Sequence, residues 1–193
     1  MNSVALIDYG SGNVHSAAGA LNEAARRAGL AIDIAITDDP AAIAAAARIL
    51  LPGVGHYADC AANLRARPGL VAALESAVLT RKIPFLGICV GMQLLADTGR
   101  EDGVTPGLGW IPGIVDRIAP GPGLRVPHVG WNSLAIARPH ALLAGLGPDP
   151  HAYFTHSYAF TPQDPADIAA TTDYGAPFTS AVARGNIFGT QFH

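Results

Sequence analysis

Apolar runs and segments of helical spacing alternate along the first half of the chain. Four short apolar runs predict buried strands, at residues 3–8, 31–37, 48–55 and 83–88. Three intervening segments predict helices, at residues 14–28, 38–47 and 70–80. Such alternation predicts a parallel sheet with helices on both faces and with functional sites at the carboxyl ends of the strands.

The second half of the chain is richer in glycine and proline, and its apolar runs are shorter. Five β-like runs predict strands, at residues 109–118, 126–136, 152–160, 167–174 and 178–193. We expect these strands to pair antiparallel, to extend the sheet and to form a small second layer. Because no linker, internal repeat or low-complexity tail interrupts the pattern, we expect residues 1–193 to form a single α/β domain.

Composition and charge narrow the class of protein. Half of the 193 residues are hydrophobic and 14% are charged, which indicates a compact globular protein rather than a disordered one. The net charge of −3 gives no reason to expect nucleic acid or an anionic membrane as a partner. No apolar run reaches the roughly 18 residues of a membrane-spanning helix. The two cysteines have dissimilar surroundings and the first residues lack a signal-peptide pattern, so we expect a reducing cytoplasm as the location.

One apolar stretch, "IPFLGICVGMQLL", carries a cysteine between a predicted strand and a helix predicted to begin over residues 92–96. Cys89 has a glycine two residues away on either side, Gly87 and Gly91, which is the G-x-nucleophile-x-G elbow with cysteine in place of serine. The glycines let neighbouring backbone approach closely, and we expect the positive end of the helix to favour the thiolate. A free cysteine often only packs in a core, and this simpler interpretation applies to Cys60, which has no glycine frame.

Acyl chemistry at a thiolate needs a base, usually a histidine. His193 closes a glycine-punctuated strand, so we expect it at a strand end and take it as the candidate base. His128 and His156 lie in or beside predicted strands and are interpreted as core or interface residues, and the other histidines as surface residues. The loop from Pro52 to Gly55 and the N–H of Val90 could supply donors to an oxyanion, although a Pro-Gly segment is usually only a turn.

The sequence carries no signal for a bound metal or nucleotide. No group of His and Cys residues has the spacing of metal ligands. The segment "DYGSGN" lacks the third glycine of a dinucleotide fingerprint and the lysine of a P-loop. We therefore expect no metal and no cofactor.

Five motifs occur in a recognisable order: "LPGVGHY", "GICVGMQLL", "PHVGWN", "YFTHSY" and "GTQFH". Together with "DYGSGN", they make nearly the whole chain similar to the class I glutamine amidotransferases. The cysteine elbow is shared by the class, whereas "PGVG", "PHVGWN" and "DYGSGN" resemble the glutaminase subunits that supply ammonia to a cyclase in histidine biosynthesis. The resemblance implies a flavodoxin-like, doubly wound and mostly parallel sheet with an added antiparallel layer.

The resemblance also implies roles for the matching residues. Cys89 would attack the side-chain amide of glutamine to give a thioester and ammonia, with His193 as the base. Backbone groups would frame the oxyanion at three positions, Gly53, Val54 and Val90. The amino-acid end of glutamine would be held by Gly55, Gln93, Glu101, Ser157 and Tyr158. Three residues would face the partner of a heterodimer, a cyclase subunit with a (β/α)8 barrel: Asn13, Trp131 and Tyr153.

One departure and two alternatives accompany this interpretation. In the family the last motif continues as His-Pro-Glu-Lys, and its glutamate orients the histidine. This sequence stops at His193, and we expect that the glutamate and a closing helix are missing from the sequence as given. One alternative is a silent binding or scaffold protein on the same fold, in which the cysteine is a redox sensor or a relic. The other is a cysteine hydrolase that acts on peptides or aldehydes.

Overall fold

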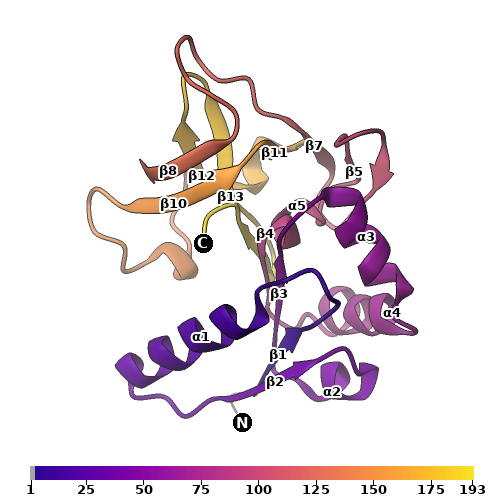
Figure 1. Cartoon of the computed structure of the whole chain (residues 1–193). Coiled ribbons are helices and arrows are strands. Elements are labelled where there is room, and N and C mark those ends of the chain that lie inside the picture. Colours follow the sequence, from indigo (N-terminus) through magenta and orange to yellow (C-terminus); the bar gives the residue numbers. More distant parts are fainter. Residues whose placement is uncertain (1–2) are drawn as a thin grey trace.

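An eight-stranded sheet lies at the centre of the structure, a computed structural model that describes residues 3–193 (Figure 1). Its strand order is β2-β1-β3-β4-β14-β13-β12-β9. The first five strands run parallel, and they are β1 (Ser3–Ile7), β2 (Asp33–Thr37), β3 (Arg48–Gly53), β4 (Phe85–Cys89) and β14 (Ile187–Thr190). The last three extend the sheet antiparallel, and they are β13 (Pro177–Arg184), β12 (Ile168–Asp173) and β9 (Ala135–Ile136). The predicted parallel sheet with an antiparallel extension is confirmed, with one difference. The run expected as one antiparallel strand at residues 178–193 forms two strands, and the second of them, β14, runs parallel to β4.

Helices cover both faces of the parallel strands. In Figure 1, α1 lies on one side of these strands, and α2, α3 and α4 lie on the other. The helices are α1 (Val14–Ala28), α2 (Pro40–Ala45), α3 (Tyr57–Ala66), α4 (Leu70–Glu75) with a π-helical continuation over Ser76–Thr80, and α5 (Val90–Gln93). Helix α2 begins where the sequence predicts, because Asp39 accepts a hydrogen bond from the N–H of Ala41 and a proline takes the first position. No helix among residues 3–193 is long and apolar enough to cross a membrane.

Two smaller sheets form the predicted second layer. One pairs β8 (His128–Ser133) with β10 (His151–His156). The other has the order β11-β7-β5-β6, with β11 (Tyr158–Pro162), β7 (Gly113–Arg117), β5 (Thr98–Gly99) and β6 (Thr105–Pro106). Short 3₁₀ turns lie at Ala141–Leu143 and Pro165–Asp167. The run predicted as one strand at residues 152–160 is broken at Ser157, so that β10 and β11 join different sheets.

The core has a layer on each face of the parallel strands. Alternate residues of β1 enter different layers, because successive side chains of a strand point to opposite faces. Ala5 and Ile7 belong to the large cluster that includes residues of α2, α3 and α4. Val4 and Leu6 belong to a smaller cluster with Val14 of α1. A strand buried on both faces has a continuous apolar sequence, which is why these runs were recognisable.

Part of the α1 face remains open. An apolar groove of about 390 Å³ lies there, and its lining includes Leu50 of β3, Leu86 of β4 and Phe188 of β14. The closing helix that the family resemblance implies stays a prediction.

Candidate active site

The carboxyl ends of three adjacent parallel strands bring the predicted chemical groups together. Gly53 at the end of β3 pairs with Cys89 at the end of β4. On the other side of β4, Thr190 of β14 pairs with Ile88, so the chain that leads to His193 emerges beside the elbow. The oxyanion loop, the cysteine and the histidine therefore meet at one edge of the sheet, as the alternating pattern predicts for the loop and the cysteine.

The elbow at Cys89 is strained, and its glycines are needed for close packing. Cys89 has φ of 56° and ψ of −113°, a conformation that costs a non-glycine residue energy and concentrates at functional sites. A Cβ on Gly87 would press against the carbonyl of Gly91, and a Cβ on Gly91 would press against the carbonyl of Leu51. Neither obstacle is a flexible side chain, so both glycines let backbone segments approach as the sequence indicated.

The helix after the elbow differs from the prediction. It was expected to begin over residues 92–96, but α5 begins at Val90, directly after Cys89, and ends at Gln93. It stops because the carbonyls of residues 94–96 accept hydrogen bonds from a distant segment. The N–H of Leu108 donates to the carbonyl of Leu94, and the N–H of Gly109 donates to the carbonyl of Ala96. The N–H groups of residues 110 and 111 both donate to the carbonyl of residue 95.

The thiol of Cys89 is not activated in the resting structure. Its side chain is buried, and burial raises its pKa to about 11. Hydrogen bonds from the backbone of Val90 and from Gln191 act in the opposite direction, and the nearby Cys60 adds to the increase. The N–H of Val90, at the start of the helix, thus favours the thiolate as expected, but desolvation outweighs it and the pKa stays above its ordinary value.

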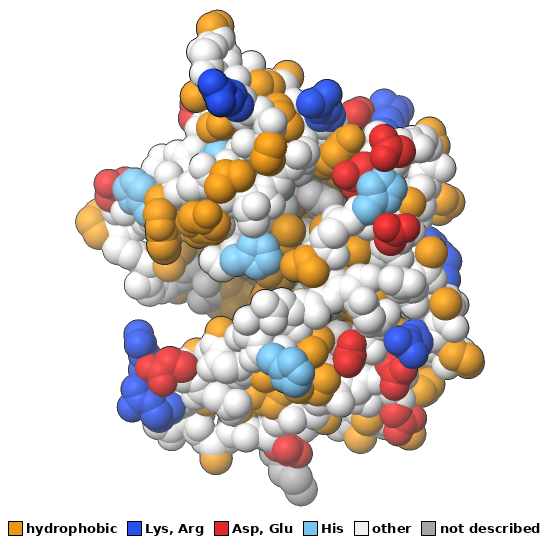
Figure 2. Space-filling model, viewed as in Figure 1, with side chains coloured by type: hydrophobic (Ala, Val, Ile, Leu, Met, Phe, Trp, Pro, Cys, Tyr) orange, Lys and Arg blue, Asp and Glu red, His pale blue; other side chains and the backbone are white. Residues whose placement is uncertain are grey.

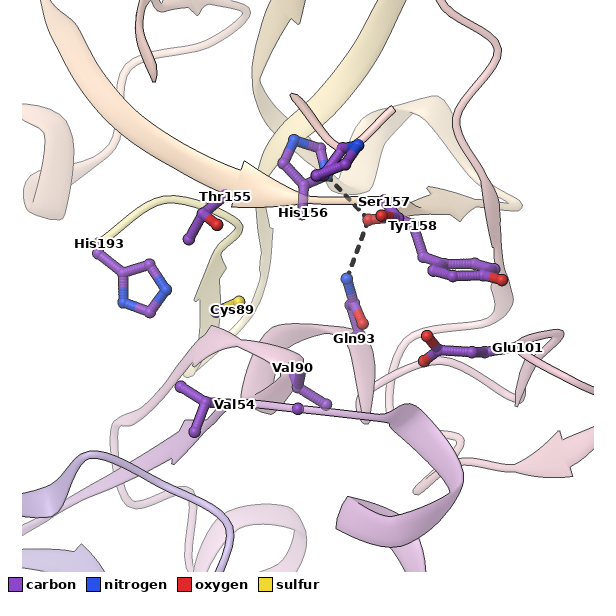
Figure 3. A pocket seen from close by; sticks show the side chains of 12 residues that line it. Val54, Cys89, Val90, Gln93, Glu101, Thr155, His156, Ser157, Tyr158 and His193 are labelled. Carbon is purple, nitrogen blue, oxygen red and sulfur yellow. Dashed lines mark hydrogen bonds between the residues drawn. The ribbon is translucent and has the colours of Figure 1, made fainter. Parts of the chain in front are cut away.

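A cavity of about 390 Å³ lies in front of the thiol (Figure 3). Among the predicted site residues, its lining includes Cys89, His193, Val54, Gly55, Val90, Gln93, Glu101, Ser157 and Tyr158. Pro127, Thr155 and His156 complete the wall. Nearly every residue predicted for catalysis or glutamine binding thus faces one cavity, and Gly53 lies at the adjacent strand end.

The candidate base shares the cavity but does not bind the thiol. Within residues 3–193 no hydrogen bond joins His193 to Cys89, and Gln191 is the side chain that donates to the Sγ, at 3.6 Å. The backbone N–H of His193 donates to the carbonyl of Tyr153, which fixes the chain direction there. Burial lowers the pKa of His193, so its ring is neutral at neutral pH and can accept a proton.

The oxyanion loop is in a conformation that cannot donate at Val54. The N–H of Val54 donates to the carbonyl of Ser11 at 2.9 Å, away from its predicted task. The thiol of Cys60 donates to the carbonyl of Val54 at 3.4 Å, which holds the loop from a second direction. A Cβ on Gly53 would contact the backbone of Gly91 and the hydroxyl of Tyr9. The sequence identified the loop, but it did not predict which way this peptide points.

Two predicted glutamine-binding residues also make contacts within the protein. Glu101 accepts a hydrogen bond from the backbone N–H of Tyr57 at 2.8 Å, at the start of α3. The amide nitrogen of Gln93 donates to the carbonyl of Tyr158 at 3.0 Å and to Oε1 of Gln191 at 2.9 Å. Gln191 is fully buried and contacts the thiol, yet sequence reasoning missed it. Its signal was its place in "GTQFH", two residues before the candidate base.

The predicted partner residues lie on exposed surface. Trp131 is 72% exposed and Tyr153 is 38% exposed, and their rings meet edge to face at 5.8 Å across the β8–β10 pair. Figure 2 shows hydrophobic side chains gathered over this pair of strands. The side chain of Asn13 accepts from the N–H of Ser16 and so caps α1. Exposed aromatic side chains of this kind are common in protein interfaces.

Comparison with known proteins identifies relatives over the whole chain. Residues 5–193 match the family model of class-I glutamine amidotransferases. The chain is 54% identical over 194 residues to the imidazole glycerol phosphate synthase subunit HisH of Caulobacter vibrioides, a match that covers 100% of this chain and 91% of that protein. It is 55% identical to the subunit of the same name from Rhodospirillum rubrum, over 98% of this chain and 90% of that protein.

Solved structures share the fold at low sequence identity. A glutamine amidotransferase crystal structure matches with a TM-score of 0.71 at 19% identity, over 98% of this chain and 89% of the other. A glutamine amidotransferase from Thermotoga maritima matches with a TM-score of 0.66 at 17% identity, over 99% of this chain and 75% of the other. Because the family model spans residues 5–193 and the relatives are more than half identical over the whole chain, the chain belongs to the class-I glutamine amidotransferase family.

Proposed function

We propose that this protein is the glutaminase subunit of imidazole glycerol phosphate synthase, which hydrolyses glutamine and passes ammonia to a cyclase subunit. The observation that carries this proposal is the elbow cysteine, Cys89, held at positive φ in a cavity that it shares with His193. The relatives named HisH support the assignment to histidine biosynthesis, since more than half of the residues are identical. The two free thiols suit a reducing cytoplasm, which we propose as its location.

In the proposed reaction, His193 removes the proton of the Cys89 thiol as the sulfur attacks the side-chain amide carbon of glutamine. Negative charge develops on the amide oxygen, and the backbone N–H groups at Val90 and Val54 are the proposed donors to it. Collapse of this intermediate breaks the C–N bond, and the proton held by His193 leaves with the nitrogen as ammonia. Water then attacks the γ-glutamyl thioester, which gives glutamate and restores the thiol.

We further propose that the isolated subunit is nearly silent and that a partner releases it by rotating the peptide between Gly53 and Val54. Two features support this: the N–H of Val54 is bound to Ser11, and the thiol of Cys89 has a pKa of about 11. Loss of one oxyanion donor costs roughly 10²–10³ in kcat, so this rotation can gate the enzyme by about that factor. Gly53→Ala should reduce activation, because its Cβ would contact the backbone of Gly91, whereas Val54→Ala keeps the donor.

The proposed partner is a (β/α)8-barrel cyclase subunit that docks on Trp131, Tyr153 and Asn13. An exposed aromatic pair would supply the apolar anchor for such an interface. The relatives' name describes a subunit of a synthase, which supports a multi-subunit assembly.

The deciding experiment measures glutamate production by the subunit alone, with a cyclase subunit, and with the cyclase and its ligand. We expect turnover to rise strongly in the complexes and to vanish in Cys89→Ala, while Cys60→Ala retains it. Turnover absent under all conditions would favour the scaffold alternative. Hydrolysis of peptides or aldehydes without any effect of the cyclase would favour the hydrolase alternative. Equal turnover by the isolated subunit and the liganded complex would refute the gate.

A further inference from the structure

Two buried histidines, one of them in the cavity wall, are not used by the proposed chemistry. His128 of β8 and His156 of β10 are 3% and 6% exposed, and they face each other across the strand pair. Nδ1 of His128 lies 3.1 Å from Nε2 of His156, and Nδ1 of His156 lies 2.9 Å from the carbonyl oxygen of Tyr158. Each histidine is therefore hydrogen-bonded in the core rather than only packed.

The neighbouring groups allow one arrangement of protons in this pair. The carbonyl of Tyr158 only accepts, so Nδ1 of His156 carries the proton and its Nε2 accepts from Nδ1 of His128. Nε2 of His128 then accepts from the amide nitrogen of Asn132 at 3.3 Å. That amide cannot turn over, because its nitrogen also donates to the carbonyl of Asp173 and its oxygen accepts from the N–H of residue 133.

The same chain of hydrogen bonds continues to the nucleophile, and Figure 3 shows its middle part, where the Tyr158 carbonyl is bound by His156 and Gln93. The carbonyl of Tyr158 also accepts from Gln93, whose amide nitrogen in turn donates to Oε1 of Gln191. Because Oε1 of Gln191 is an acceptor, its Nε2 is the donor that reaches the Sγ of Cys89. A continuous hydrogen-bonded series thus joins Asn132, His128, His156, the Tyr158 carbonyl, Gln93, Gln191 and Cys89, and we call it the relay. Its donor direction reverses at the Tyr158 carbonyl, which accepts from both His156 and Gln93.

The relay begins beside the exposed strand face. Asn132 follows Trp131, which is 72% exposed, and both lie on β8. A partner that moves this edge of β8 would displace Asn132 and His128, and the hydrogen bond to His156 would pass the shift to the Tyr158 carbonyl, which also holds the amide of Gln93. We propose that His128 and His156 are positioning residues that couple the exposed face of the β8–β10 pair, which carries Trp131 and Tyr153, to the thiol of Cys89. The direction of this coupling toward a cyclase rests on the proposed function, whereas the relay itself does not.

Packing around the pair keeps the relay neutral. The ring of His128 stacks on that of Phe154, with 4.9 Å between the ring centroids, and its centroid lies 4.1 Å from that of Tyr174. The ring centroids of His156 and Phe178 are 4.8 Å apart. Burial lowers the pKa of His128 and lowers that of His156 to about 4. Both rings therefore stay uncharged near neutral pH, and each nitrogen keeps its assigned role as donor or acceptor.

The first test compares the alkylation rate of Cys89 by iodoacetamide with and without a cyclase subunit. His128→Leu removes the donor to His156, whereas His128→Asn keeps an N–H near the position of Nδ1. Ile36→Ala is the control, because Ile36 lies on the edge strand β2, is 40% exposed and takes no part in the relay or the proposed docking surface. We expect His128→Leu to reduce the cyclase-dependent change in rate roughly 2- to 30-fold, and the other two variants to preserve it.

The second test needs no partner and observes the ring nitrogens of both histidines by ¹⁵N NMR. We expect the Nδ1–H tautomer at His128 and His156, and a shift of the His156 signals when Cys89 is alkylated. In Gln191→Leu this shift should be lost. An Nε2–H tautomer at His128, or an unchanged cyclase effect in His128→Leu, overturns the relay. If the wild-type protein shows no cyclase effect but the NMR signals behave as expected, the relay stands and the proposed partner is wrong.

Discussion

The ionisation of Cys89 gives a quantitative test of how burial controls the nucleophile. With a pKa of about 11 instead of the ordinary 9.0, only about one thiol in 1,000 is ionised at pH 8, against about one in 10 for an exposed thiol. Because only the thiolate reacts with an alkylating agent, Cys89 in the isolated protein should react about 100-fold more slowly than an exposed cysteine at pH 8. This ratio corresponds to a net preference for the protonated thiol of about 2.7 kcal/mol, after the opposing hydrogen bonds are included.

The assay follows carboxamidomethylation of the Cys89 peptide by mass spectrometry between pH 7 and about 10.5. We expect the logarithm of the rate to rise by about one per pH unit without a plateau below pH 10. Cys60→Ala removes the second thiol, and urea-unfolded protein supplies the unperturbed reference. A plateau that begins near pH 8 or below would refute the argument, because it would mean that the helix and the two donors outweigh burial.

The same shift predicts how the free energy of unfolding depends on pH. A thiol whose pKa is raised on folding stabilises the native state fully below pH 9, and this contribution is lost as the pH rises toward 11. The difference between wild type and Cys89→Ala in urea unfolding should therefore change by up to about 2.7 kcal/mol across that window. A difference that is constant with pH would contradict the raised pKa.

Three further predictions test the site and its support. A diazo-ketone analogue of glutamine should label Cys89, which lines the cavity, and spare Cys60, and equal labelling in peptide mass spectrometry would contradict the choice of nucleophile. Gly91→Ala should destabilise the protein in urea by about 1–3 kcal/mol, because its Cβ meets the β3 backbone. Gly19 lies in the middle of α1, and a Cβ added there would contact no other atom, so Gly19→Ala should stabilise the protein by about 0.5–1 kcal/mol. Similar effects of Gly91→Ala and Gly19→Ala would argue against close packing at the elbow. Arg184→Met should cost about 1–3 kcal/mol, since it leaves a buried aspartate without its two guanidinium donors, and an unchanged urea midpoint would contradict this.

Local patterns determined the main architecture of this protein. The alternation of apolar runs and helical segments was sufficient to predict the parallel sheet, because strands buried on both faces require continuous apolar sequence. The glycines around Cys89 identified the elbow, since the strained φ of 56° and the close approach of Gly87 to Gly91 are local to the turn. The same reasoning placed Gly53 at the strand end beside Cys89, because parallel strands expose their carboxyl ends at one edge. It placed His193 at a strand end, but the parallel pairing of that strand with β4 came only from the structure.

Contacts between distant segments changed the local outcome at the end of α5. Residues 92–96 have the composition of a helix, yet α5 ends at Gln93. The carbonyls of residues 94–96 are instead bound by the N–H groups of residues 108–111, and no periodicity in either segment indicates this pairing. Helix length here was decided by competition for hydrogen bonds and not by propensity.

Only the tertiary structure decided the chemical state of the site. The pKa of Cys89 depends on how completely other segments exclude water, and a motif does not report burial. The direction of the Val54 N–H depends on Ser11, which lies in a different loop. The contacts between His128 and His156 and between Gln93 and Gln191 join residues 28 and 98 positions apart. Periodicity describes neighbours along the chain, whereas desolvation and long-range hydrogen bonds arise only when distant segments pack together.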